Sequence, residues 1–145
     1  AIEEDHFWAA CIVARFTDDA VRAIVGTARF TDRGATEYLT NVILERRAKV
    51  LNSWLNGTNP LVNLAPSAGG ELTFENEAEK AGVGKAAERY TAQWSRFDNA
   101  TGQMEPFGGE ETAASARIQA PADLLAVRPE YVAVRLRTFH TDHPA

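Results

Sequence analysis

The chain has a single cysteine, few clustered basic residues and no long apolar run, and each of these scarcities excludes a class of site, segment or partner. Cys11 stands alone among 145 residues, which excludes an internal disulfide and a metal or redox site built on a Cys-x-x-Cys pair. Its place among apolar residues of a predicted helix favours a buried thiol. No apolar stretch approaches the roughly 20 residues that span a bilayer, so no transmembrane segment is predicted.

The charge is acidic overall, with a formal net charge of −5. Apart from the Arg46-Arg47 pair the basic residues are scattered, whereas phosphate binding requires a basic patch. The composition therefore argues against nucleic acid or an anionic membrane as the main partner. The first residue is Ala, and no basic and apolar leader follows it, so we expect a processed, trimmed or excerpted chain.

A helical segment is predicted for residues 1–57, and its most prominent part is a long amphipathic helix from Asp32 to Asn56. Two shorter helices are predicted before it, at residues 3–15 and 18–28. The pentapeptide Ala-Arg-Phe-Thr-Asp precedes both later helices, which predicts Thr17 and Thr31 as N-caps. Gly57 is predicted to stop the long helix in a left-handed conformation.

The pattern changes after this segment, because residues 58–70 are rich in turn-forming residues and are predicted to be a linker. Alternation then predicts strands at residues 71–74, 89–97 and 131–139. Residues 110–119 are compatible with a further strand, and residues 121–126 with a helical turn. We therefore expect an α+β chain whose residues 71–145 form an immunoglobulin- or fibronectin-III-like sandwich. About 75 residues are short for such a module, so it is expected to be incomplete, with an open edge that the parent polypeptide or a partner fills.

A family resemblance is carried by residues 5–10, 15–19, 22–25, 36–39, 43–49, 54–55, 59–61, 90–99 and 131–144, which cover most of the chain. The sequence resembles the C-terminal region of large bacterial proteins without an assigned activity, which implies an extracytoplasmic location and an appended β domain whose final strands are absent. One departure lies at Asp32-Arg33-Gly34, where the family pattern has Pro at the helix start.

The best metal-like cluster consists of His140, Asp142 and His143, with His6 distant in sequence. Imidazole and carboxylate groups bind Zn²⁺ and can build a catalytic site. However, a His-x-Asp-His run without the spacing of a stiff element is more typical of a polar loop. No metal, cofactor or catalytic residue is therefore assigned.

Other candidate groups have structural explanations. Helix capping and surface pairing account for the acids Asp18, Asp19, Asp32, Glu37 and Glu45. Core packing is the favoured role of the aromatic residues Trp8, Trp54, Trp94, Tyr38 and Tyr90, which would otherwise form a ligand platform. Helix amphipathicity leaves the Arg46-Arg47 pair unexplained, and one of the two is expected to face an acid.

Three hypotheses follow. The first is a non-catalytic structural or protein-interaction region of a larger bacterial extracytoplasmic protein, with another chain or the rest of its own polypeptide as partner. The second is a hydrolase fragment with a site at the junction of the two halves. The third is a carbohydrate- or peptide-binding module that uses exposed tryptophans.

Overall fold

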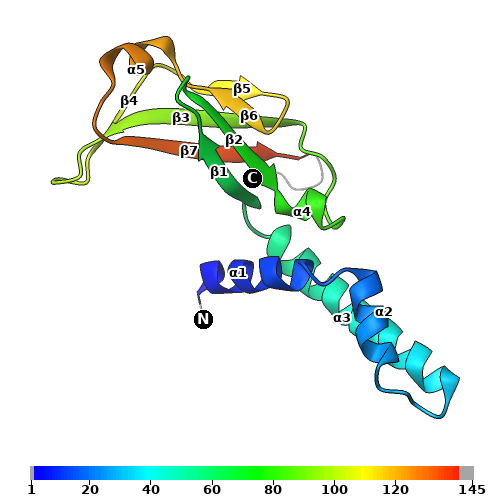
Figure 1. The fold of residues 1–145 in the computed structure, drawn as a ribbon. Coiled ribbons are helices and arrows are strands. Elements are labelled where there is room, and N and C mark those ends of the chain that lie inside the picture. Colours follow the sequence, from blue (N-terminus) through cyan, green and yellow to red (C-terminus); the bar gives the residue numbers. More distant parts are fainter. Residues whose placement is uncertain (1, 141–145) are drawn as a thin grey trace. The chain divides into compact units, whose positions relative to one another are not determined.

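The computed structural model describes residues 2–140, in which helices and antiparallel sheets form two compact units (Figure 1). The helical unit comprises Ala1–Pro60 and Glu77–Lys85, and the sheet unit comprises Leu61–Asn76 and Ala86–Ala145. The predicted α+β class is confirmed. The division differs from the predicted one at residues 1–57, 58–70 and 71–145, because the chain enters the sheet unit, returns to the helical unit and leaves it again.

The helical unit contains α1 (Glu3–Ala14), α2 (Asp18–Gly26), α3 (Arg33–Leu55) and the single turn α4 (Glu77–Lys80). Both α1 and α2 pack against α3. The predicted N-cap of α2 is confirmed, since the Thr17 side chain accepts a hydrogen bond from the Ala20 N–H. The predicted cap of α3 is wrong by one residue: Asp32, not Thr31, accepts from the Gly34 N–H, at 2.8 Å.

The C-terminal cap of α3 differs from the predicted left-handed Gly57. Asn56 is the C-cap, with φ −95°, and Gly57 is absent from the positive-φ residues of the described chain. A Cβ at position 57 would lie 2.7 Å from the Ser53 carbonyl oxygen, so glycine is required there for space. The Asn56 side-chain amide donates to the Val83 carbonyl at 2.9 Å, which connects the helix end to the returning segment.

The core of the helical unit is small. Leu51 and Leu55 of α3 are fully buried, and they pack with Ala10 of α1 and Ala78 of α4. The small alanine side chains allow the helices to approach α3 closely. Because α4 supplies part of this core, Glu77–Lys85 belongs to the helical unit although strands precede and follow it.

The sheet unit is entirely antiparallel. One sheet has the strand order β1-β2-β6, and in the other β3 pairs with β7 along its length and with β4 and β5 over shorter stretches. A short helix, α5 (Ala122–Val127), precedes β7, in agreement with the predicted helical turn. The strand bounds are β1 Leu61–Pro66, β2 Glu71–Asn76, β3 Arg89–Phe97, β4 Met104–Pro106, β5 Glu111–Ala113, β6 Arg117–Gln119 and β7 Val132–Phe139.

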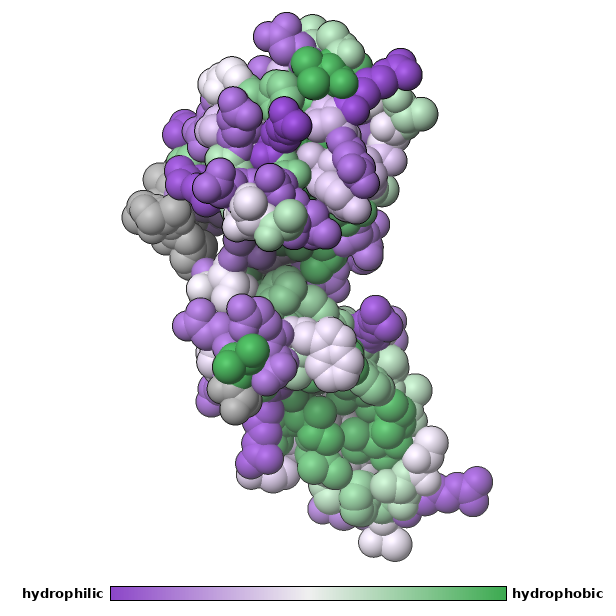
Figure 2. Space-filling view, turned by 90° about the vertical axis from the view of Figure 1, so that its left-hand side faces the viewer, coloured by the Kyte–Doolittle hydropathy of each residue, from purple (hydrophilic) through white to green (hydrophobic). Residues whose placement is uncertain are grey.

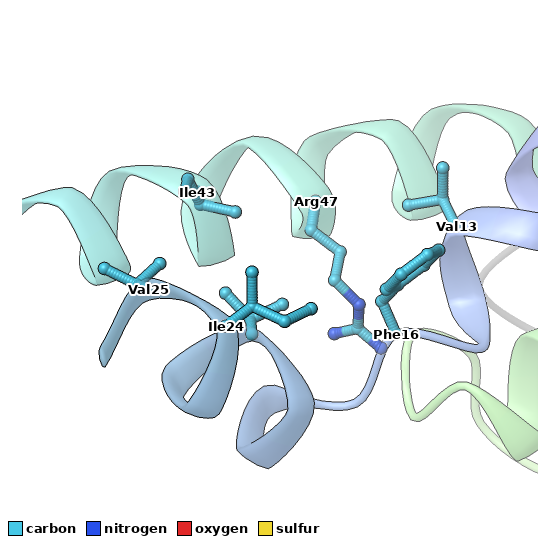
Figure 3. A pocket seen from close by; sticks show the side chains of 7 residues that line it. Val13, Phe16, Ile24, Val25, Ile43 and Arg47 are labelled. Carbon is cyan, nitrogen blue, oxygen red and sulfur yellow. The ribbon is translucent and has the colours of Figure 1, made fainter. Parts of the chain in front are cut away.

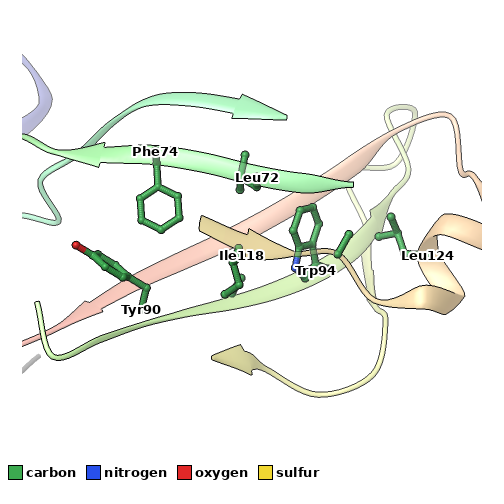
Figure 4. Close-up of a cluster of buried hydrophobic side chains, with 8 residues drawn as sticks. Leu72, Phe74, Tyr90, Trp94, Ile118 and Leu124 are labelled. Atoms are coloured by element: carbon green, nitrogen blue, oxygen red, sulfur yellow. The ribbon is translucent and has the colours of Figure 1, made fainter. Parts of the chain in front are cut away.

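The core of this unit lies between β2 and β3. Leu72 and Phe74 on β2 and Tyr90 and Trp94 on β3 point toward one another, with Ile118 of β6 among them (Figure 4). Alternate residues of β3 therefore face the core, as its sequence pattern predicts. The predicted burial of Trp94 and Tyr90 is confirmed.

β1 and β4 were not predicted, and the single strand expected within residues 110–119 is two short strands, β5 and β6, in different sheets. β1 lies inside the expected linker, and β4 follows a turn closed by hydrogen bonds from the Ala100 and Thr101 N–H groups to the Asp98 carboxylate. A glycine at position 70 makes the β1–β2 turn possible: its φ is +84°, and a Cβ there would clash with the Leu125 side chain. The expected incompleteness of the module stays a prediction.

Candidate functional site

The helical unit has an apolar groove between α2 and α3, which we call the α2–α3 groove (Figure 3). Its volume is about 230 Å³. It is lined by Val13, Phe16, Val21, Ile24, Val25, Ile43 and Arg47.

Helical periodicity explains how the sequence builds this groove. Val21, Ile24 and Val25 follow one another at the spacing that places side chains on one face of α2. On α3, Ile43 and Arg47 are four residues apart and thus lie one above the other. Val13 and Phe16, at the end of α1 and in the turn after it, close one end of the groove.

Arg47 is the polar exception in this lining. Its side chain is 15% exposed, and its guanidinium donates to the Asp18 carboxylate at 3.1 Å and, more weakly, to the Ala14 carbonyl at 3.4 Å. Its Nε is buried and has no hydrogen-bond partner among the described residues. Arg46 is exposed, so Arg47 is the arginine of the pair that meets an acid. The Arg47–Asp18 ion pair connects α3 to the first turn of α2.

Large apolar side chains around the groove remain in contact with solvent. Ile24 is 57% exposed and Phe16 is 48% exposed, although both line the groove. Figure 2 shows apolar residues gathered in the lower part of the view, over the helical unit. A monomer rarely exposes many such side chains together without a partner for them. Further exposed apolar residues of this unit are Ile2, Trp8, Ile12, Phe30, Tyr38, Leu39 and Val50.

The size of the groove limits what it can bind. Small-molecule sites usually measure about 300–1,000 Å³, and a cavity of about 150 Å³ is enough for a benzene ring. A groove of about 230 Å³ therefore fits one or two large apolar side chains of a partner better than a cofactor. Its walls offer no carboxylate or imidazole for acid–base chemistry.

The predicted metal candidates are only partly visible. Asp142 and His143 lie outside the described residues, so the cluster with His140 stays untested. His6 belongs to the helical unit, where its ring stacks on Trp54 with centroids 4.1 Å apart and planes inclined by 17°. Among the described residues, no group of three His, Cys, Asp or Glu side chains is arranged to hold a metal ion.

The aromatic residues divide into two groups. Trp94 and Tyr90 are buried in the sheet unit and do not reach solvent, whereas Trp8 is 68% exposed and Tyr38 is 73% exposed. The expected core role is thus wrong for Trp8 and Tyr38, because α1 and α3 each leave one side uncovered.

The pKa values of Cys11 and Asp98 depart from their ordinary values, and both shifts have local causes. Burial, followed by the charge of Glu77, raises the pKa of the Cys11 thiol. The side chain is only partly buried, less than the buried thiol that the sequence predicts. Hydrogen bonds from the Thr101 and Ala100 N–H groups lower the pKa of Asp98. Neither group lines the α2–α3 groove.

In the described part of the chain, no helix is both long enough and apolar enough to cross a membrane. Comparison of the sequence and the structure with protein-family models, curated proteins and solved structures finds no match.

Proposed function

We propose that this chain is a non-catalytic protein-interaction region of a larger bacterial extracytoplasmic protein, and that its α2–α3 groove binds an amphipathic helix of a partner. The observation that carries the proposal is the groove itself: an open apolar channel, bordered by two helices, whose lining residues Ile24 and Phe16 remain half exposed. The bacterial and extracytoplasmic parts rest on the family resemblance.

A helix is the partner that fits this channel best. Two helices side by side present a groove into which the ridges of a third helix pack, and peptide-binding grooves of this kind accept apolar anchors at helical spacing. The volume of about 230 Å³ accommodates one or two such anchors. Both α1 and α2 contact α3, and the helices keep other faces uncovered. A docked helix would therefore enlarge the core of the helical unit, which contains few buried residues.

The sheet unit is part of the same proposal, as an immunoglobulin- or fibronectin-III-like module. Its strand orders, β1-β2-β6 and β4-β3-β7, resemble the orders A-B-E and C′-C-F of such sandwiches, with the short β5 as an additional strand paired with β3. The buried Trp94 lies on the strand that corresponds to C, where these domains carry a core tryptophan.

The groove proposal is tested with two labelled peptides: an amphipathic helix with leucines at i, i+3, i+4 and i+7, and a peptide of equal composition with the leucines scrambled. Fluorescence anisotropy should show preferential binding of the first. Ile24→Glu, which places a charge in the groove, should weaken it tenfold or more, as expected for a central apolar anchor. Val127→Glu is the matched control, because Val127 is 60% exposed but lies on α5 in the sheet unit.

Two results would contradict the proposal. Equal affinity for both peptides would indicate nonspecific hydrophobic binding. Equal binding by the two variants would place the contact outside the groove. Circular dichroism of each variant establishes that it remains folded.

A further inference from the structure

A second surface, unrelated to the groove, lies on the side of β3 and β7 that faces away from the sheet core. Core residues of β3 occupy even-numbered positions, such as Tyr90 and Trp94, so its odd-numbered residues face the other way. The register pairs Arg89 with Phe139, Thr91 with Arg137 and Gln93 with Arg135. Three arginines from two strands thus share one face. We call this surface, composed of Arg89, Arg135, Arg137, Thr91 and Phe139, the arginine face.

The charge of this face opposes that of its surroundings. The residues of the sheet unit include ten acids and six bases, a net charge of −4, and half of those bases lie here. Arg137 reaches Glu110 at 3.7 Å, but both side chains are about half exposed, so this ion pair is weak. Arg89 and Arg135 form no ion pair with a described residue. The arginine face therefore keeps a local positive charge on an acidic unit.

Neighbouring side chains on the same face contact or adjoin the arginines. The Arg89 guanidinium carbon lies 4.2 Å from the centre of the Phe139 ring, a cation–π contact that orients the side chain in advance. Thr91 is 4% exposed, and its hydroxyl has no hydrogen-bond partner among the described residues. Buried hydroxyls usually have a partner, so an unsatisfied one beside Arg137 indicates an incomplete polar site.

We propose that the arginine face binds an extended acidic segment of a partner protein, with carboxylates at alternate residues. Arg135 and Arg137 project from one strand two residues apart, a repeat of roughly 6.6–6.8 Å. An extended peptide repeats its same-side carboxylates at the same distance, and guanidinium groups bind carboxylates in a bidentate manner. Acidic polysaccharides repeat their charges by the sugar ring, so they match this spacing less well.

The test uses two labelled hexapeptides of identical composition, one with Glu and Thr alternating and one with three Glu followed by three Thr. Binding to the full chain is measured by fluorescence anisotropy at low and high salt. The alternating peptide should bind more tightly, and salt should weaken its binding because exposed charges are screened.

Variants locate the contact. Arg135→Gln and Arg137→Gln should each weaken binding of the alternating peptide by about three- to tenfold, as for partly exposed arginine–carboxylate pairs. Arg96→Gln is the control. It removes one positive charge from β3, but at an even-numbered position, which lies on the opposite side of the strand from the arginine face. It should leave the affinity within about twofold of that of the unchanged chain.

Three results would overturn the proposal. The first is no measurable binding of the alternating peptide at low salt. The second is equal loss in all three variants, which would indicate a response to net charge alone. The third is displacement of the peptide by polyglucuronate at lower concentration than by the unlabelled peptide, which would identify a polysaccharide site. None of these results bears on the α2–α3 groove, whose peptides carry no acidic repeat.

Discussion

Replacing Thr91 with valine should stabilise the sheet unit, contrary to the usual effect of changing a buried residue. Thr91 is 4% exposed, and its hydroxyl has no hydrogen-bond partner among the described residues. Valine has nearly the same shape and the same branching at Cβ, so neither packing nor strand preference changes. The substitution removes only the buried polar group.

The size of the effect follows from the free energy of an unsatisfied hydroxyl. Leaving a buried donor or acceptor unpaired costs about 1–3 kcal/mol. Taking the lower end of this range, we expect Thr91→Val to raise the free energy of unfolding by about 1 kcal/mol. For a unit of this size, that corresponds to an increase in melting temperature of roughly 4–8 °C.

The same substitution at Thr40 is the matched control. Thr40 is 5% exposed, and its hydroxyl donates to the Thr36 carbonyl at 2.8 Å, one turn earlier on α3. Thr40→Val removes a hydrogen bond that exists, so it should bring no gain and a loss of up to about 1 kcal/mol. Urea unfolding of both variants, followed by circular dichroism, measures the difference. If Thr91→Val is no more stable than the unchanged chain, the hydroxyl is satisfied in solution and the argument for an incomplete polar site fails.

Two further predictions concern the helical unit. Leu51→Ala should destabilise it by about 3–5 kcal/mol, since Leu51 is fully buried. Leu39→Ala, on the exposed side of α3, should cost less than about 1 kcal/mol. Similar losses of the two variants in urea unfolding would contradict the assigned core. Cys11 should react with iodoacetamide more slowly in the folded chain than in urea, because burial raises its pKa above the ordinary 9.0 and keeps the thiol protonated. A raised folded-state pKa stabilises the fold below the unfolded value, and this contribution is lost as the pH rises through the folded value. Equal labelling rates in both states would refute the burial of the thiol.

Sequence periodicity predicted the elements whose side chains follow one regular pattern. Residues 89–95 alternate without interruption, and the predicted bounds Arg89–Phe97 coincide with those of β3. β1 escaped prediction because it does not alternate regularly: Asn63 has φ +54°, and the register with β2 shifts between Val62 and Ala65. Such a bulge inserts a residue and breaks the period of two on which strand prediction depends. The prolines and glycines around β1 then favoured a linker.

The groove was only partly accessible to sequence reasoning. Helical periodicity places Val21, Ile24 and Val25 on one face of α2, a pattern typical of a core face, but Ile24 is 57% exposed. The sequence predicts that one residue of the Arg46-Arg47 pair faces an acid. Neighbouring residues of a helix differ by about 100° in direction, so the rotation of α3 against α2 decides which one turns inward. That rotation depends on packing that the sequence pattern does not specify.

The arginine face shows the same limit for a sheet. Arg135 and Arg137 are visible in the sequence as alternate residues of one strand, but Arg89 lies far earlier in the chain and joins them only through the β3–β7 register. A shift of that register by one residue would turn every side chain of β7 to the opposite face, burying both arginines and exposing Val134 and Leu136. The pattern that keeps Val134 and Leu136 on the core side is therefore what holds the arginines together on the other. If the proposed acidic segment binds, the residues that position its site are those apolar side chains as much as the arginines that would touch it.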